Sequence, residues 1–210
     1  MADLLPLFPL PNVVLFPNVF LPLHIFEPRY REMISDAVAS DRMIGIVLLR
    51  PGWERDYDGR PPVYTVGCSG VLTHVERMAD GRYNLVLRGL ERFRIVGEDH
   101  DRSYRRASIE PLPEQRLSAD DEAAIRNQRS KLESMLSPAV ERAGADYRTP
   151  SAMSDEDLVN ALAQYLDLEA LEKQALLEQP CLRTRAAALV ELLEMKIMMA
   201  RTPGLSHFAH

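Results

Sequence analysis

A few side chains of this 210-residue chain have the types and spacing that could support chemistry. His24 and Glu27 stand three residues apart, a spacing found in metal sites, but a zinc-binding helix would also carry a second histidine. Cys68 could act as a nucleophile with His74 or His24 as its base, if its thiol lay in an electropositive, partly exposed site. A cysteine in an apolar strand more often belongs to the core. We therefore expect no metal, no cofactor and no catalytic residue, and we expect Glu27 to cap the helix that follows it.

Four further side chains are candidates for contact with a peptide. Arg88 and Arg92 flank Gly89 and could bind a phosphate or a carboxylate. The simpler interpretation is a β-bulge that carries two solvated arginines. Trp53 and Tyr57 lie in a charged, turn-rich loop, where aromatic side chains either fold back onto the protein or bind a partner. These four residues are our candidate peptide-binding set.

The opening of the chain is apolar and is interrupted by proline. Its first 26 residues contain five prolines, at positions 6, 9, 11, 17 and 22. Each proline fixes φ and removes a backbone donor, so a helix of useful length is excluded. The first basic residue is Arg29, which also argues against a secretion signal. The pattern predicts extended chain that is broken into short strands at the edges of a β core.

Local patterns predict the other elements of the first half. Apolar residues at helical spacing after Pro28 predict a helix over 28–39, and a continuous apolar run predicts a buried strand over 43–49. Asp80-Gly81 predicts a hairpin between strands at 64–78 and 82–96, because both residues tolerate the positive φ of a tight turn. A last strand is expected around 107–109.

Beyond residue 113 helical signals dominate. We expect helices over about 119–137, ending before Pro138, and over 155–166, 168–178 and 181–201. Ser118 with Asp121, and Ser154 with Asp157, have the spacing of helix-capping pairs. In the last helix Met195, Met198 and Met199 could form an adaptable binding surface. Core packing is the favoured interpretation for at least Met195 and Met199.

Composition limits the possible functions. The net charge is −6, and the chain contains three lysines; residues 1–112 carry 14 Arg, no Lys and 15 acidic side chains. This balance gives no general attraction to nucleic acid, whose binding requires that phosphates be neutralised. The two cysteines are far apart and are expected to be reduced thiols in a cytoplasmic protein. The phosphate-binding pattern G-x-x-x-x-G-K-[ST] is absent, so the sequence offers no ATP site.

Several motifs, in this order and spacing, resemble the N-terminal substrate-binding domain of Lon protease over about residues 4–112. They are Leu5-Pro6-Leu7-Phe8, Val14-Leu15-Phe16-Pro17, Leu21-Pro22-Leu23-His24-Ile25-Phe26-Glu27-Pro28-Arg29-Tyr30, Val66-Gly67-Cys68-Ser69-Gly70, Asp80-Gly81-Arg82 and Leu87-Arg88-Gly89-Leu90-Glu91-Arg92-Phe93. The chain is more specifically similar to stand-alone bacterial proteins that carry this domain without ATPase or protease modules. The signature positions expected to be structural are Phe16, Pro17, Pro22, His24, Phe26, Glu27, Arg29, Tyr30, Gly67, Gly70, Asp80, Gly81, Gly89 and Phe93.

The resemblance implies an α+β fold: a PUA-like pseudo-β-barrel with one or two helices over residues 1–114, then a C-terminal α-helical bundle over 115–203. We expect a disordered tail over 204–210. The implied function is non-enzymatic binding of unfolded or degradation-prone proteins and peptides through apolar surface, with a separate protease or chaperone as a further partner and no membrane. The alternatives are an RNA-binding PUA-like protein, since such barrels also bind RNA, and, ranked last, a small hydrolase. The sequence leaves the oligomeric state open.

Overall fold

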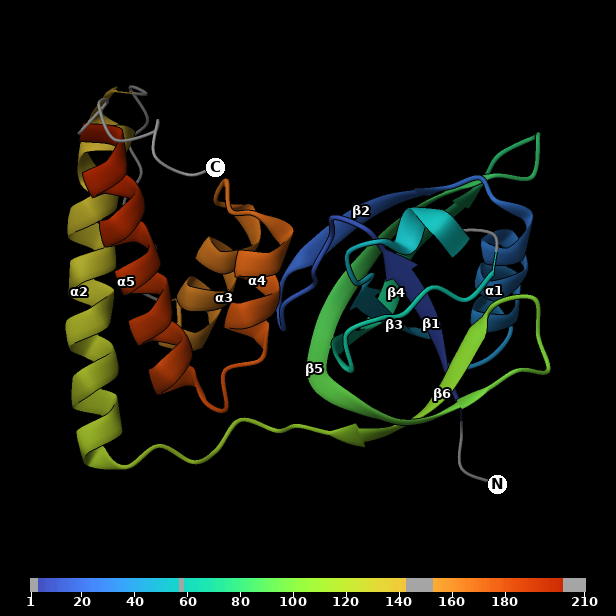
Figure 1. Ribbon diagram of the computed structural model, residues 1–210, viewed down its shortest axis with the longest axis horizontal. Coiled ribbons are helices and arrows are strands. Elements are labelled where there is room, and N and C mark those ends of the chain that lie inside the picture. Colours follow the sequence, from blue (N-terminus) through green and yellow to red (C-terminus); the bar gives the residue numbers. More distant parts are fainter. Residues whose placement is uncertain (1–3, 57–58, 143–152, 202–210) are drawn as a thin grey trace. The chain divides into compact units, whose positions relative to one another are not determined.

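The computed structural model describes residues 4–56, 59–142 and 153–201, and Tyr57 and the tail at 204–210 lie outside these ranges. Within them the fold is mixed α/β (Figure 1). The strands are β1 (Leu5–Leu10), β2 (Phe20–Ile25), β3 (Met43–Leu48), β4 (Val66–Arg77), β5 (Tyr83–Asp99) and β6 (Arg105–Pro111). The helices are α1 (Pro28–Val38), the 3-10 helix η1 (Trp53–Asp56), α2 (Ala119–Arg142), α3 (Asp155–Tyr165), α4 (Ala170–Leu177) and α5 (Leu182–Arg201).

Five of the strands form a closed barrel. The strand order is β2-β5-β4-β3-β1-β6, and β5 also pairs with β6, which closes the ring. Closure is possible because β5 is 17 residues long and curves from one neighbour to the next (Figure 1). Its first half pairs with β2 and its second half with β6. Strand β2 is therefore an added edge strand outside the ring, and the α+β pseudo-barrel expected from the sequence is confirmed.

The barrel interior is filled by apolar side chains from strands that are distant in the sequence. One cluster consists of Leu5, Leu7, Val47, Leu49, Val63, Phe93 and Ala107, with Trp53 packed against it. Full burial of each large apolar side chain stabilises the fold by roughly 1.5–3 kcal/mol. The proline-rich opening contributes strands β1 and β2, as expected. The apolar run between them, residues 13–16, forms no strand, although Val14, Leu15 and Phe16 are buried.

Two glycines shape β5 and the turn before it. At Gly89 an added Cβ would lie 2.1 Å from the carbonyl oxygen of Phe16, because the loop before β2 crosses β5 there. Asn18 N donates to the Gly89 carbonyl at 2.9 Å. The hairpin predicted at Asp80-Gly81 is confirmed, but of these two residues only Gly81 has positive φ. Met78 N donates to the Arg82 carbonyl, so the connection is wider than a two-residue turn.

The helices of the second half differ from the prediction in two respects. Helix α2 does not end before Pro138 but continues to Arg142. Directly before Pro138, the Ser137 hydroxyl donates to the carbonyl of Glu133, which lies one turn earlier in the helix. A proline removes its own N–H and crowds the carbonyl four residues before it, at a cost of about 3 kcal/mol, but a helix can continue past it when other contacts compensate. The start of α2 is as predicted: Ser118 and Asp121 cap each other reciprocally.

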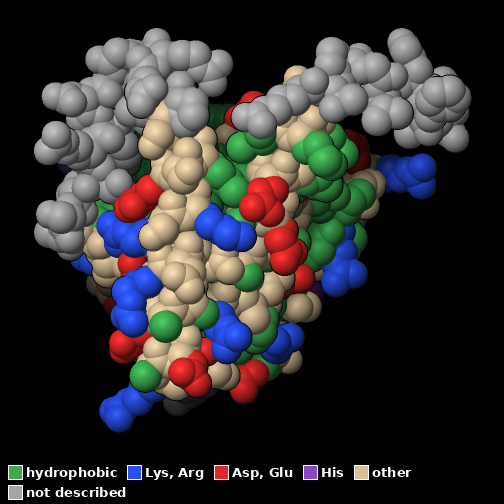
Figure 2. Space-filling view, turned by 90° about the vertical axis from the view of Figure 1, so that its left-hand side faces the viewer, with side chains coloured by type: hydrophobic (Ala, Val, Ile, Leu, Met, Phe, Trp, Pro, Cys, Tyr) green, Lys and Arg blue, Asp and Glu red, His purple; other side chains and the backbone are tan. Residues whose placement is uncertain are grey.

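The methionines of α5 are not core residues. Met195, Met198 and Met199 have exposed fractions of 41%, 64% and 62%, so the expected burial of Met195 and Met199 is wrong. Figure 2 shows hydrophobic side chains gathered along one side of the face formed by α2 and α5. The apolar stripe of α5 that packs inward lies nearer its start, at Leu182, Ala186, Leu189 and Val190. The helical spacing of the apolar residues in α5 is as predicted. Among the described residues, however, no element covers the C-terminal end of this helix.

The chain divides into two compact units. The first contains residues up to Pro113 together with Asn160–Glu178, and the second contains Glu114–Val159 and the chain from Gln179 onward. The first break falls between Pro113 and Glu114, whereas the sequence places a boundary after residue 114. Residues 160–178, however, group with the barrel rather than with α2 and α5. The domain boundaries drawn from the sequence therefore remain a prediction, and we describe each unit separately.

Candidate functional site

The added strand β2 and its neighbours expose one face of the sheet. In the β2–β5 register Phe20 lies opposite Arg88, and Pro22 lies opposite Val86. In the β4–β5 register Val86 lies opposite His74. Because side chains alternate along a strand, these residues share one side of the sheet. We call this surface the outer face; it consists of Phe20, Pro22, His24, His74, Glu76, Asn84, Val86 and Arg88.

The outer face carries exposed apolar side chains. Phe20 is 49% exposed, and Phe26, just beyond β2, is 60% exposed. Phe26 stacks beside the His24 ring, with centroids 6.4 Å apart. A shallow, mostly apolar depression crosses the three strands between Pro22 and Val86. Because β2 carries apolar side chains on both of its sides, it can cover the barrel and still present phenylalanine to solvent.

The free edge of β2 is only partly open to another strand. Phe20 directs its carbonyl away from β5, since that oxygen accepts the Tyr165 hydroxyl at 3.0 Å. In an antiparallel strand the backbone N–H and C=O groups of every second residue point to the same edge, so those of Pro22 and His24 also point to the free edge. Pro22 has no N–H to offer, which explains why proline is tolerated there. The edge can therefore accept a short extended segment but is protected against indiscriminate strand pairing.

Hydrogen bonds connect three polar side chains of the outer face. His24 Nδ1 lies 2.7 Å from Asn84 Oδ1, and Asn84 Nδ2 donates to Glu76 Oε2 at 3.4 Å. His24 thus serves as a hydrogen-bonding partner across β2 and β5. Within the described residues no three His, Cys, Asp or Glu side chains group together in a way that could hold a metal ion.

Buried amides attach residues 160–178 to the barrel. Phe16 N donates to Gln164 Oε1 at 3.2 Å, and Asn160 Nδ2 donates to the Pro17 carbonyl at 3.3 Å. Gln174 Nε2 donates to the Val66 carbonyl at 3.0 Å. These amides satisfy barrel groups that would otherwise be buried without partners. These contacts were not predicted from the sequence, although amides within apolar helical stripes are the signal that could have indicated them.

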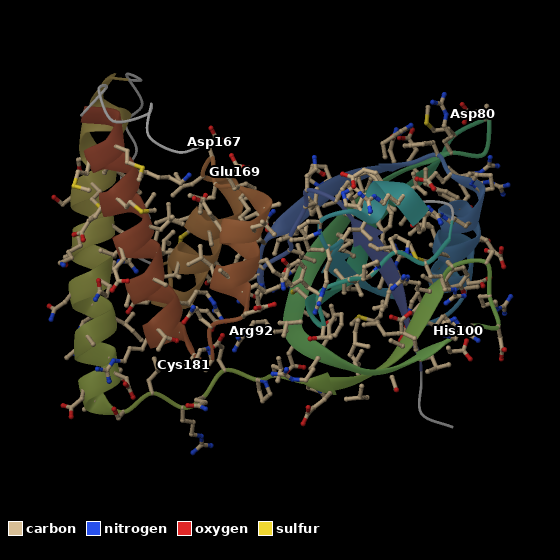
Figure 3. The ribbon with its side chains drawn as sticks, in the orientation of Figure 1. Asp80, Arg92, His100, Asp167, Glu169 and Cys181 are labelled. Atoms are coloured by element: carbon tan, nitrogen blue, oxygen red, sulfur yellow. The ribbon has the colours of Figure 1, made fainter. Side chains whose placement is uncertain are left out.

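Arg92 belongs to this attachment and is not a solvated arginine. It is 3% exposed, and its Nη1 donates to the Leu177 carbonyl at 3.1 Å. Figure 3 shows Arg92 between β5 and the end of α4. The interpretation of two solvated arginines is therefore wrong for Arg92, because α4 covers that part of β5. It holds for Arg88, which is exposed on the outer face. The β-bulge expected here is present: Cys68 pairs with Arg92 and Gly70 with Gly89, so β5 has one extra residue between Gly89 and Arg92.

Of the other candidate residues, those that the structure describes do not form a common site. Trp53 is half-buried against the barrel cluster, and Tyr57 lies outside the described residues. Cys68 is fully buried, and its thiol donates to the Ser69 carbonyl. His74 is six residues further along β4, roughly 20 Å away at the rise of an extended strand, and it is exposed. The structure does not bring a thiol and an imidazole together along β4.

Glu27 occupies the capping position of α1 but does not cap the helix with its side chain. Its Oε2 instead pairs with Arg29 Nη2 at 3.0 Å, and the Arg29 guanidinium lies over the Tyr30 ring at 4.7 Å. The expected side-chain cap is therefore wrong, because the neighbouring guanidinium provides a charge-assisted partner.

None of the helices in the described ranges combines the length and apolar composition needed to cross a membrane.

The family model described as "ATP-dependent protease La (LON) substrate-binding domain" matches residues 4–195. Among curated proteins, Lon protease 2 of Myxococcus xanthus is 32% identical over 199 residues, and Lon protease of Anaeromyxobacter dehalogenans is 32% identical over 196. These matches cover 92% and 91% of this chain but 24% and 23% of the relatives. The chain thus spans about a quarter of their length.

Two solved structures share the fold. The N-terminal domain of Mycobacterium avium complex Lon protease superposes with a TM-score of 0.69 at 21% identity, covering 91% of this chain and 98% of that one. The Lon N-terminal domain protein from Xanthomonas campestris gives a TM-score of 0.59 at 22% identity, covering 90% and 98%.

Proposed function

Because the chain belongs to the LON substrate-binding domain family, we propose that it recognises unfolded or degradation-prone proteins and catalyses no reaction itself. The observation that carries this proposal is the outer face, where an edge strand presents phenylalanine to solvent. Folded proteins bury such side chains, so an exposed apolar segment of a client has complementary chemistry. The exposed Arg88 on the same face favours clients that also carry acidic side chains.

The expected binding energy follows from the exposure of the two phenylalanines. Full burial of a phenylalanine is worth roughly 1.5–3 kcal/mol, and Phe20 and Phe26 are 49% and 60% exposed. A client that covers both therefore gains about 2 kcal/mol in total, which corresponds to roughly 30-fold in affinity. This energy suits a reversible binding module that releases its client.

The test measures binding of a reduced, alkylated and therefore permanently unfolded model protein by fluorescence anisotropy. The variant Phe20→Ser/Phe26→Ser is expected to bind roughly 30-fold more weakly than the wild type. The matched control is Val96→Ser, since Val96 is 62% exposed on β5 but lies outside the outer face. Equal binding by the double variant and the wild type would contradict the proposal, as would equal losses in the double variant and the control.

RNA binding is the alternative from the sequence. It is distinguished by measuring RNA affinity at two salt concentrations, because phosphate contacts make affinity fall steeply with added salt. We further propose a cytoplasmic location and delivery of the client to a separate protease or chaperone. Co-purification of a protease with the wild type but not with Phe20→Ser/Phe26→Ser would support this second step.

A further inference from the structure

A second concave site lies in the barrel unit, away from the outer face. It is a cavity of about 170 Å³ between the start of α1, the segment after η1 and the start of β6. Three arginines line it: Arg29, Arg60 and Arg105. None of the described residues that line it is acidic. A pocket with three guanidinium groups and no lining carboxylate has the composition of an anion site.

Two of the three positive charges are balanced by neighbours outside the lining. Arg29 pairs with Glu27 at 3.0 Å, and Arg105 Nη1 pairs with Glu98 Oε1 at 3.2 Å. Arg60 has only backbone partners among the described residues: its Nη1 donates to the Asp99 carbonyl and its Nη2 to the Arg102 carbonyl, both at 3.2 Å. Among the described side chains, Arg60 is therefore the lining arginine whose charge no carboxylate balances.

The buried arginine is affected by the other two. Arg105 is 6% exposed, and burial is the main cause that lowers its pKa. Glu98 opposes this shift, whereas the charges of Arg60 and Arg29 lower the pKa of Arg105 further. The three guanidinium groups thus repel one another across the cavity, and a bound anion would relieve that repulsion.

The rest of the lining is mixed: Tyr30, Ser103 and Tyr104 carry hydroxyl groups, and three residues are apolar. Pro9, Leu49 and Pro61 are buried and line the same cavity. One guanidinium without a carboxylate partner matches a monovalent carboxylate better than a phosphate, which carries more charge at neutral pH. The three apolar residues of the lining match an apolar group that is attached to the carboxylate. A peptide presents both features together at its C-terminal residue.

We propose that this cavity binds the free C-terminal carboxylate of a client peptide that ends in a small or medium apolar residue. The inference rests on the proposed function, because it assigns one part of the client to a second site. Arg60 would contact the carboxylate, and Pro9, Leu49 and Pro61 would contact the terminal side chain. The outer face would bind a more internal apolar segment.

The test uses the N-acetylated tetrapeptide Gly-Gly-Ala-Leu with a free C-terminus, and the same peptide as its C-terminal amide, in NMR titrations of the full chain. The free acid is expected to bind at least about tenfold more tightly than the amide, since hydrogen bonds to charged groups are the strong ones. Arg60→Gln should weaken binding of the free acid about tenfold. Arg94→Gln, at an exposed arginine of β5 outside the cavity, should leave it unchanged.

Arg29→Gln provides a second variant if Arg60→Gln fails to fold, and it should also weaken binding of the free acid. Equal affinity for acid and amide would overturn the proposal, and so would equal losses in Arg60→Gln and Arg94→Gln. Stronger displacement of the peptide by phosphate than by acetate at equal concentration would show a bare-anion site and would also overturn it. If unfolded protein still binds while the acid and the amide do not differ, this inference fails and the proposed function stands.

Discussion

Gln164 offers a sharp test of how residues 160–178 are attached to the barrel. Phe16 is fully buried, and its backbone N–H donates to Gln164 Oε1 at 3.2 Å. Replacement by leucine keeps the volume similar but removes the acceptor. A buried donor left without a partner costs about 1–3 kcal/mol. We therefore expect Gln164→Leu to lower the free energy of unfolding by about 2 kcal/mol.

Thermal and urea unfolding followed by circular dichroism measure this loss. For a chain of this size, 1 kcal/mol shifts Tm by roughly 2–4 °C, so Gln164→Leu should lower Tm by about 4–8 °C. The control is Gln115→Leu, at an exposed position, which should stay within about 0.5 kcal/mol of the wild type.

Amide hydrogen exchange at Phe16 locates the effect. If the hydrogen bond is broken and the segment loosens, the Phe16 amide should exchange faster in Gln164→Leu than in the wild type, while amides of α2 and α5 should not change. An unchanged free energy of unfolding together with unchanged Phe16 protection would refute the role that we assign to Gln164.

Three other changes have expected outcomes. Gly89→Ala should lower the free energy of unfolding in urea by about 2–3 kcal/mol, because its Cβ would meet the Phe16 carbonyl oxygen at 2.1 Å; a neutral effect would contradict the observed crossing. Arg185→Leu should lose about 2–3 kcal/mol in the same assay, since Arg185 is fully buried and pairs with Glu114 at 2.5 Å, and adding Glu114→Leu should restore part of it. The pKa of Tyr104 is raised to about 12, mainly by burial. The neutral Tyr104 side chain therefore makes its full contribution to the free energy of unfolding below pH 10, and this contribution is lost as the pH rises toward 12. Urea midpoints at pH 9 and 11 should therefore differ less in Tyr104→Phe than in the wild type.

Elements that depend on local signals were predictable. The helix after Pro28 and the hairpin at Asp80-Gly81 were both found where expected, because proline at a helix start and glycine in a turn act on their own backbone. The end of α2 was placed too early, since a proline near a helix end is tolerated when neighbouring contacts compensate.

Side-chain environments that depend on distant segments were not predictable. The burial of Arg92 depends on α4, 85 residues further along the chain, and no local pattern reports that contact. The outer face was anticipated only through Arg88, because the exposure of Phe20 depends on where β2 pairs. The cavity around Arg60 combines residues from segments that the sequence keeps apart.

Closure of the barrel has a consequence for synthesis on the ribosome. Strand β1 pairs with β3 on one side and with β6 on the other, where Leu5 lies opposite Ala107. The first strand to emerge therefore waits for the last before its hydrogen bonding is complete. Such non-local pairing slows folding and leaves apolar segments uncovered in the meantime. A nascent chain that ends before residue 111 should accordingly depend on holdase chaperones more than the finished protein does.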